Sequence, residues 1–129
     1  MMERILIIDD EPSVRDAVSA LLKKDGYRVV AAECGHAGVG AIAAFAFDVV
    51  IVDIFMPGMD GLETIKIIRE NAPEVAIIAM TGYAFGGELA DVFDAAVEFG
   101  ATCGLHKPFS GAELKAAIAT CRRSLALVA

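Results

Sequence analysis

Residues Asp48 to Gly61 read D-V-V-I-V-D-I-F-M-P-G-M-D-G, an apolar run that ends in a carboxylate and passes into a loop. The β-branched residues from Val49 to Val52 are typical of a strand that is buried on both faces in the middle of a parallel sheet. Asp53 comes directly after this run, and open α/β sheets carry their chemistry at the carboxyl ends of their strands. The segment alone leaves two roles open for Asp53, a functional carboxylate or a residue that only caps the loop.

The rest of the chain alternates between strand-like and helix-like patterns, and the alternation occurs five times. We expect strands over residues 4–9, 27–32, 48–53, 75–80 and 101–106, and helices over 12–25, 35–47, 61–71, 89–99 and from 110 past 121. This order predicts one α/β domain over residues 1–129, with a parallel sheet, helices on both of its faces and right-handed crossovers. The strand order 2-1-3-4-5 of the flavodoxin-like, doubly wound folds fits the pattern.

Composition and charge exclude several classes of function. With 129 residues, of which 57% are hydrophobic, the chain can form one full core, and no apolar run is long enough to span a membrane. The net charge of −7 argues against a nucleic-acid surface, which needs clustered Lys and Arg. The N-terminus passes directly into a strand and leaves no room for a signal peptide, so we expect a cytoplasmic protein.

The chain has three cysteines, Cys34, Cys103 and Cys121, which are widely spaced and form no C-x-x-C pair. An odd number at such spacing favours reduced structural thiols over a disulfide framework or a zinc site. We therefore expect these thiols to stay reduced and to have no functional role.

The helix expected over residues 35–47 is unusual because it has no charged face. It also contains Gly38 and Gly40, each of which destabilises a helix by about 1 kcal/mol relative to Ala. Either a partner covers this helix or it is a weak element of the fold. We favour a self-association surface, which would support a weak homodimer.

Local signals define two other helices. Ser110 and Glu113 have the spacing of a capping box, which predicts the start of the last helix. In the helix over 61–71, apolar residues recur at three- and four-residue spacing and predict one buried face. The polar residues between them are expected to face water: Lys66, Arg69 and Glu70.

The carboxyl ends of the expected strands supply one set of chemically capable side chains. These are Asp9 and Asp10 after the first strand, Asp53 after the third, Thr81 after the fourth and Lys107 after the fifth. In the order 2-1-3-4-5 the first and third strands are neighbours, and the crevice at the topological switch lies between them. Carboxylate, hydroxyl and ammonium groups are therefore expected to converge on one place.

The concentration of negative charge at this place calls for a cation. Two carboxylates about 4 Å apart repel by roughly 1 kcal/mol in water and by about 4 kcal/mol at an effective dielectric constant near 20. Lys107 offsets only part of this charge, whereas a hard divalent cation such as Mg²⁺ suits an all-oxygen set with open water positions. With the ion bound, one carboxylate can attack phosphorus and form an acyl phosphate, while the ion and Lys107 neutralise the charge that develops.

With these residues in place, the chain resembles a response-regulator receiver domain, the phosphoacceptor module of two-component signalling, in its single-domain, chemotaxis-type form. The resemblance covers essentially the whole chain. Each motif alone is common, but all of them at the ends of the correct strands and in the correct order form a specific signal. The motifs are Asp9-Asp10, Asp53 with its M-P-G-M-D-G loop, Thr81-Gly82 and Lys107-Pro108-Phe109.

The resemblance implies a role for each residue of the set. Asp53 would accept a phosphoryl group from a phosphohistidine on a sensor histidine kinase or phosphotransfer protein, and the chain would then change its binding to a downstream protein. Lys107 would pair with Asp53 and then with the phosphoryl group, and its bond to Pro108 would be cis. Thr81 would donate a hydrogen bond to the phosphoryl group. The ligands of Mg²⁺ would be Asp9, Asp10, Asp53 and the backbone carbonyl of Phe55.

One position departs from the pattern of the family. The family commonly has Tyr or Phe three residues before the lysine, a ring that turns inward as the Thr moves, and this chain has Gly104. Tyr83 or Phe85 could supply a substitute ring, and the Gly86-Gly87 pair lies in the same segment. A degenerate receiver that acts only as a protein-interaction module is therefore the alternative to a phosphoacceptor.

Two other classes of protein share parts of the pattern. Haloacid-dehalogenase phosphatases need a second Asp two residues after the nucleophile as general acid, where this chain has Phe55. A flavodoxin-like redox module would need a phosphate-binding loop at residues 9–11, which are all acidic and would repel the phosphate. We thus expect the chain to catalyse only its own phosphorylation and dephosphorylation. It ends soon after its last helix, which favours a stand-alone receiver over a fragment of a longer regulator or hybrid kinase.

Overall fold

The computed structural model describes residues 3–56, 60–82 and 89–128, and it confirms the predicted alternation of strand and helix. The strands are β1 (Arg4–Ile8), β2 (Arg28–Ala32), β3 (Val49–Asp53), β4 (Ala76–Thr81) and β5 (Cys103–His106). The helices are α1 (Pro12–Lys24), α2 (Gly35–Ala44), α3 (Gly61–Asn71), α4 (Leu89–Phe99) and α5 (Gly111–Val128). The residues Pro57, Gly58, Tyr83, Phe85, Gly86 and Gly87, on which some expectations fall, lie outside the described residues.

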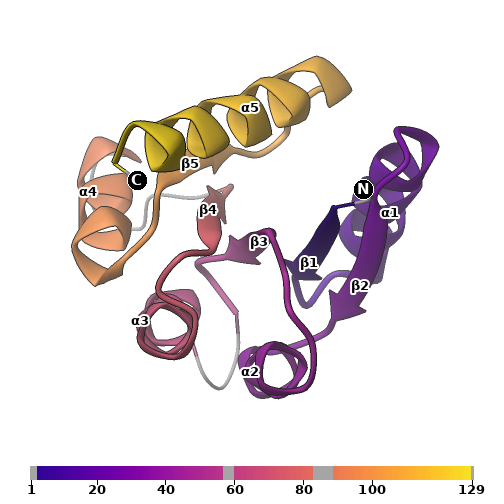
Figure 1. The fold of residues 1–129 in the computed structure, drawn as a ribbon. Coiled ribbons are helices and arrows are strands. Elements are labelled where there is room, and N and C mark those ends of the chain that lie inside the picture. The colour runs from indigo at the N-terminus through magenta and orange to yellow at the C-terminus, as the bar shows by residue number, and fades with distance from the viewer. Residues whose placement is uncertain (1–2, 57–59, 83–88, 129) are drawn as a thin grey trace.

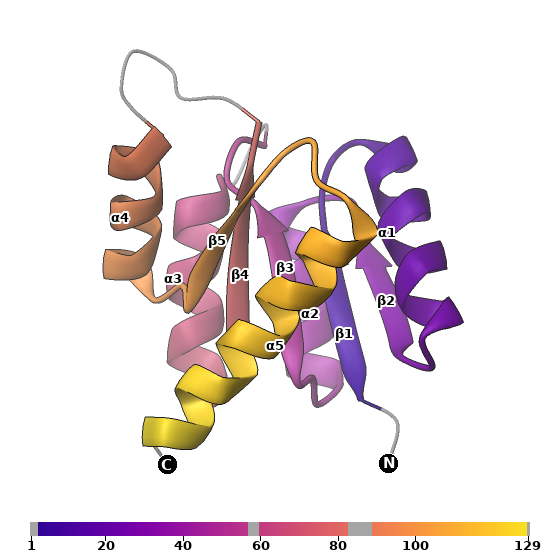
Figure 2. The ribbon, with the colours of Figure 1, turned by 90° about the horizontal axis from the view of Figure 1, so that it is seen from above.

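The sheet is parallel and has the predicted order β2-β1-β3-β4-β5. Figures 1 and 2 show α1 and α5 on one face, α2 and α3 on the other, and α4 beside β5. The side chains of β1 alternate between the two faces of the sheet. Ile5 and Ile7 pack in the apolar cluster of α1 and α5, which covers one face. Leu6 and Ile8 pack in the apolar cluster of α2 and α3, which covers the other face. Every residue of β3 and β4 is buried, as their apolar runs predict.

Two boundaries differ from the prediction by more than one residue, and several others differ by one residue. Helix α2 ends at Ala44 instead of continuing to residue 47, because the chain turns there to pair Asp48 with Arg4 at the start of β1. The Asp48 N–H donates to the Arg4 carbonyl at 2.9 Å, and the Arg4 N–H donates to Asp48 Oδ2 at 2.9 Å. Strand β5 begins at Cys103 instead of residue 101, because the segment before it forms the turn from α4 and contacts α3.

Helix α2 lies close to the sheet because it contains Gly38. A Cβ atom at this position would lie within 3.0 Å of the Ile8 side chain, so the glycine permits a close approach in addition to weakening the helix. Gly40, in contrast, has open space beside it. The exposed residues of α2 are mostly small and uncharged, and self-association through this face stays a prediction.

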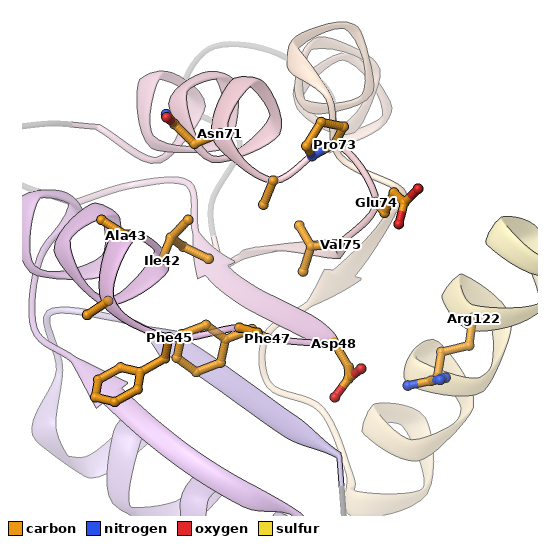
Figure 3. A pocket seen from close by; sticks show the side chains of 13 residues that line it. Ile42, Ala43, Phe45, Phe47, Asp48, Asn71, Pro73, Glu74, Val75 and Arg122 are labelled. Carbon is orange, nitrogen blue, oxygen red and sulfur yellow. The ribbon is translucent and has the colours of Figure 1, made fainter.

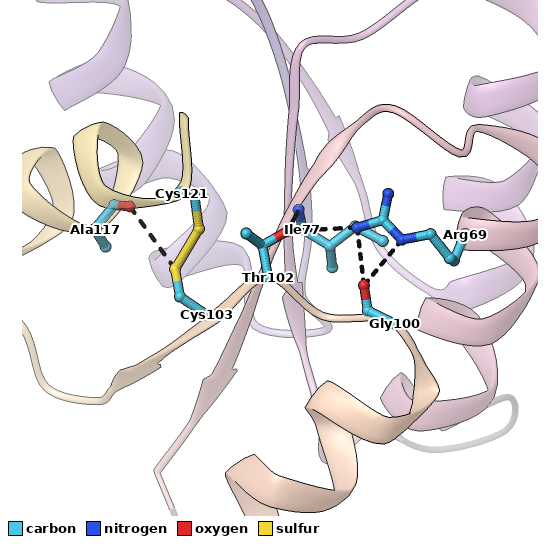
Figure 4. The surroundings of a disulfide bond; sticks show 7 residues. All are labelled: Arg69, Ile77, Gly100, Thr102, Cys103, Ala117 and Cys121. Carbon is cyan, nitrogen blue, oxygen red and sulfur yellow. Dashed lines mark hydrogen bonds between the residues drawn. A yellow bond between two sulfur atoms is a disulfide. The ribbon is translucent and has the colours of Figure 1, made fainter. Parts of the chain in front are cut away.

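Two expectations about single residues are wrong, and Figure 4 shows both. Cys103 of β5 and Cys121 of α5 form a disulfide, although they are 18 residues apart in the sequence, because the fold brings their Cα atoms to 6.2 Å. Only Cys34 is a free thiol among the three cysteines. Arg69 does not face water, since its guanidinium lies against the turn before β5 and donates to the Gly100 carbonyl at 2.8 and 3.0 Å.

The starts of the helices agree with their local signals. In the capping box of α5, the Glu113 N–H donates to Ser110 Oγ and the Ser110 N–H donates to Glu113 Oε1, both at 3.1 Å. Asp60 caps α3 by accepting a hydrogen bond from the Glu63 N–H at 2.8 Å. In the part of the chain that the structure describes, no helix combines the length and the apolar character that crossing a membrane requires.

Candidate functional site

The predicted site residues converge at the carboxyl edge of the sheet. Asp53 ends β3 and Thr81 ends β4, while Asp9 and Lys107 directly follow β1 and β5. The register of the sheet makes these positions neighbours, and the Lys107 N–H donates to the Thr81 carbonyl at 2.8 Å. Thr81 is fully buried in this arrangement.

Asp9, Asp10 and Asp53 form an acidic cluster, as the strand order predicts. One carboxylate oxygen of each residue lies within 4.8 Å of the others. Asp9 and Asp53 are buried, whereas Asp10 is exposed at the rim of the cluster. A set of oxygen ligands with one open side has the chemistry that Mg²⁺ requires, because this ion combines carboxylates with several retained water molecules.

Lys107 is the cation of this cluster, and its side chain is only 16% exposed. Its Nζ atom lies 2.7 Å from Asp9 Oδ2 and 3.3 Å from Asp53 Oδ2. The predicted pair with Asp53 is therefore present, but the shorter contact is with Asp9. One ammonium group thus bridges two buried carboxylates of neighbouring strands.

Backbone donors orient both carboxylates. The Glu11 N–H donates to Asp9 Oδ1 at 2.9 Å, and the Phe55 N–H donates to Asp53 Oδ1 at 3.2 Å. Arg15, which sequence reasoning missed, donates from Nη1 to the Asp9 carbonyl at 2.7 Å. The sequence did carry a signal for this contact. Arg15 lies one helical turn after residues 9–11, and a side chain at that position of α1 can reach back to the end of β1.

Gly61 connects the start of α3 to the strand end that carries Asp53. Its N–H donates to the Ile54 carbonyl at 2.9 Å, and a Cβ atom at this position would lie within 3.0 Å of the Asp53 and Ile54 backbone. Since backbone atoms cannot move aside as a side chain can, only glycine fits here. The last glycine of the M-P-G-M-D-G motif therefore helps to position Asp53.

The pKa values of Asp53 and Lys107 are shifted by burial and by the charges of their neighbours. Burial raises the pKa of Asp53, the attraction of Lys107 opposes this, and the nearby charge of Asp9 raises the pKa further. Burial alone would lower the pKa of Lys107, but its hydrogen bond to Asp9 and its attraction to Asp53 and Asp9 raise it overall. Without a further cation, the folded state holds an ionised Asp53 at a net cost.

Asp53→Asn is expected to stabilise the protein at pH 7 by about 1 kcal/mol, since it removes a buried charge whose desolvation cost the attraction of Lys107 does not fully offset. Because the pKa of Asp53 is raised in the folded state, its ionisation lowers stability as the pH rises from 3.8 through the folded pKa. The gain of the variant should therefore vanish below pH 3.8. Urea unfolding at several pH values measures it. Asp94→Asn, at an exposed site, is the control, and a native chain as stable as Asp53→Asn at pH 7 would contradict the expectation.

Where the family commonly has Tyr or Phe on β5, this chain has Gly104, and an aromatic side chain from α4 packs at that position. A Cβ atom at Gly104 would lie within 3.0 Å of the Phe93 ring, so Phe93 packs directly on the glycine. Phe93 is half-buried in the cluster of α2 and α3. Helix α4 therefore supplies an aromatic side chain next to this strand, and glycine at position 104 makes room for it.

Gly104→Ala is expected to lower the free energy of unfolding by about 2 kcal/mol, because the added methyl group overlaps the Phe93 ring. Phe93→Ala in the same chain removes the overlap. The double variant should thus be more stable than the sum of the two single effects predicts, by about 1 kcal/mol or more. Urea unfolding of the four proteins measures this coupling, and strictly additive effects would exclude the contact.

A wide hollow at the opposite edge of the sheet contains none of these residues (Figure 3). Its volume is about 1280 Å³, and it lies between the end of α2, the α3–β4 connection and Arg122 of α5. Phe45 and Phe47 line one side, and their rings meet edge to face at 6.5 Å. A smaller apolar hollow of about 520 Å³ adjoins Lys107 at the carboxyl edge.

Similar sequences include a protein of comparable length and a much longer one. The chain is 33% identical over 118 residues to sporulation initiation phosphotransferase F of Bacillus subtilis (strain 168), and the match covers 92% of each. It is 40% identical over 90 residues to sensor protein GacS of Pseudomonas syringae pv. syringae, covering 66% of this chain and 10% of that protein. The chain thus spans only a small part of some relatives.

A solved structure agrees in fold, and a family model agrees in sequence. Response regulator protein TrrA from Thermotoga maritima, in complex with Mg(2+)-BeF, superposes with a TM-score of 0.80 and 32% sequence identity, over 93% of this chain and 99% of that chain. The model of the response regulator receiver domain matches residues 5–119. Because this match covers most of the sequence and the acidic edge lies inside it, the chain belongs to the response regulator receiver domain family of two-component signalling.

Proposed function

We propose that the chain is a Mg²⁺-dependent phosphoacceptor and that Asp53 carries the phosphoryl group. The observation that supports this most strongly is the set of Asp9, Asp10, Asp53 and Lys107 at one edge of the sheet. Asp53 has the nucleophilic oxygen, Lys107 has the cation that can pair with a phosphoryl oxygen, and Thr81 has a hydroxyl at the end of the next strand. The family membership agrees with this assignment.

In the proposed transfer, an Asp53 carboxylate oxygen forms a bond to phosphorus, and the bond between phosphorus and the histidine nitrogen of the donor breaks. The electron pair of that bond stays on the imidazole, which then takes a proton from solvent. Lys107 lies 3.3 Å from Asp53 Oδ2 and can shift from that carboxylate to an oxygen of the phosphoryl group. Bound Mg²⁺ would supply further neutralisation of the negative charge.

Asp9, Asp10 and Asp53 would hold the ion, with the backbone carbonyl of Phe55 as a further ligand. Their oxygens lie close enough together for one cation, and Asp10 leaves the cluster open to water on one side. The related protein TrrA was solved with Mg(2+)-BeF, which supports the same ion for this chain. Lys107 offsets only part of the negative charge of the cluster, so a divalent ion would relieve the repulsion that remains.

The donor would be a sensor histidine kinase or a phosphotransfer protein. The apolar hollow beside Lys107, lined by Val14, Leu21 and Phe109 among others, offers such a protein a contact surface next to Asp53. We further propose a single receiver domain over residues 1–129 in the cytoplasm, which catalyses only its own phosphorylation and dephosphorylation. Its output would be altered binding to a downstream protein.

Incubation with acetyl phosphate and Mg²⁺, followed by intact-mass measurement, tests the proposal. We expect an adduct with the mass of one phosphoryl group that requires Mg²⁺ and is lost in Asp53→Asn. Asp94→Asn, which changes an exposed carboxylate of α4, should keep the adduct. The absence of any adduct would favour the degenerate receiver that only binds proteins, and turnover of a free phosphoester would favour a phosphatase.

A further inference from the structure

The disulfide between Cys103 and Cys121 joins strand β5 to helix α5 (Figure 4). Cys121 is fully buried in the apolar cluster of α1 and α5, together with Leu114 and Ile118. Cys103 is only partly buried, so it is the more accessible residue of the pair. This asymmetry is what stepwise thiol–disulfide exchange requires, because the accessible sulfur reacts first and the buried one resolves the mixed disulfide.

The fold accommodates the reduced form as well as the oxidised form. The Cys103 sulfur lies 3.7 Å from the Ala117 carbonyl, one turn before Cys121 on α5, and a thiol there would donate its hydrogen to that oxygen. A reduced Cys121 would stay in an apolar cluster, where a free cysteine behaves as a small hydrophobic residue.

The core does not depend on a covalent link. Small domains need disulfides when they cannot bury enough apolar surface, but this chain has an apolar cluster on each face of a five-stranded sheet. The position of the bond indicates another role. It closes the loop from Cys103 to Cys121, which contains Lys107 and the whole connection from β5 to α5. Oxidation therefore restrains the segment that supplies the cation of the acidic cluster.

We propose that Cys103 and Cys121 form a reversible redox modification site that exchanges with low-molecular-weight disulfides. The Cys103 thiolate attacks the disulfide, a mixed disulfide forms, and one thiol leaves. The Cys121 thiolate then attacks the Cys103 sulfur, and the second thiol leaves. Two protein thiols are oxidised and lose two protons, and one low-molecular-weight disulfide is reduced to two thiols. The inference goes beyond the proposed phosphoryl transfer and does not rest on it.

Equilibration of the folded chain with mixtures of reduced and oxidised glutathione tests the site. After quenching with an alkylating agent, intact mass should report three blocked thiols under reducing conditions and one under oxidising conditions, with a reversible transition between them. Cys34→Ser should remove one blocked thiol throughout and keep the transition, whereas Cys103→Ser should abolish it. Three blocked thiols at every ratio, or a pair that the native fold never lets glutathione reduce, would overturn the proposal.

Hydrogen exchange of the Cys34→Ser chain supplies a second readout. Amides of residues 103–121 should exchange at least about tenfold more slowly in the oxidised form, because the bond removes opened states of the loop. Amides of β1, far from the loop in the sequence, serve as the internal reference. Equal rates in the two forms would overturn the inference that oxidation restrains the segment that contains Lys107. Neither experiment involves phosphorylation, so both can be interpreted even if the proposed phosphoacceptor function is wrong.

Discussion

Replacement of Lys107 by Met is expected to lower the free energy of unfolding at pH 7 by about 3 kcal/mol, because it leaves two buried carboxylates without their cation. Asp9 is fully buried, and Asp53 is almost so. The ammonium group contacts both of them, at 2.7 and 3.3 Å, so its loss exposes each carboxylate to the repulsion of the other. Urea unfolding of the native chain and the variant measures the difference.

The effect of Lys107→Met should depend on pH in a defined direction. The pKa of Lys107 is raised in the folded state, so its stabilising effect is complete below 10.5 and is lost as the pH rises through the folded pKa. At acidic pH Asp53, whose pKa is raised by burial, becomes neutral, and the repulsion between the two carboxyl groups in the variant disappears. The difference between the two proteins should therefore be largest near neutral pH and shrink in both directions.

A divalent cation should partly replace the missing ammonium group. Mg²⁺ that binds only the folded state stabilises it in proportion to the logarithm of its concentration, and the variant has more uncompensated charge to bind it. The matched control is Lys115→Met, whose exposed pair with Asp25 should contribute less than about 1 kcal/mol. Equal destabilisation by both substitutions, or no recovery of Lys107→Met in Mg²⁺, would argue against a charged cluster that needs a cation.

The fold and most of the candidate site could be predicted because they depend on short-range patterns. Apolar runs define the strands, and each run ends in the residue that carries the chemistry, as at Asp53 and Thr81. Once the strand order is assumed, parallel pairing brings their carboxyl ends to one edge without any knowledge of side-chain contacts. The cis bond between Lys107 and Pro108, implied by the family resemblance, is also present.

The features that could not be predicted from the sequence are contacts that a side chain makes with another element of the fold. The Lys107 Nζ atom lies nearer to Asp9 than to Asp53, and this difference depends on how β1, β3 and β5 are positioned relative to one another. Phe93 packs on Gly104 because α4 crosses β5 at that residue, and no periodicity encodes such a crossing. The pairing of Cys103 with Cys121 likewise requires the distance between β5 and α5. These contacts arise only when helices and sheet are packed together.

Arg69 is the clearest case of this limit, and its replacement by Met is expected to lower the free energy of unfolding by about 3 kcal/mol. Its position on α3 indicates a solvated side chain. The guanidinium instead donates hydrogen bonds to backbone carbonyls of the α3–β4 and α4–β5 connections. Nη1 donates to the carbonyls of Val75 at 2.6 Å and Pro73 at 2.9 Å, and Nε and Nη2 donate to that of Gly100. Burial lowers the pKa of Arg69, yet a guanidinium stays charged at neutral pH.

The loss of Arg69 should destabilise mainly the two segments that lead into β4 and β5, because its hydrogen bonds go to Pro73, Val75 and Gly100. Gly100 has φ +125°, and a Cβ atom there would lie within 3.0 Å of the Arg69 side chain, so the turn is shaped around this residue. Lys66→Met, which makes the same replacement at an exposed position of α3, controls for helix propensity and should change stability by less than about 0.5 kcal/mol. Arg69→Lys keeps the charge but has one nitrogen for several carbonyls, so it should recover only a small part of the loss. A fully stable Arg69→Lys chain would mean that charge alone matters and that the carbonyl bonds contribute little.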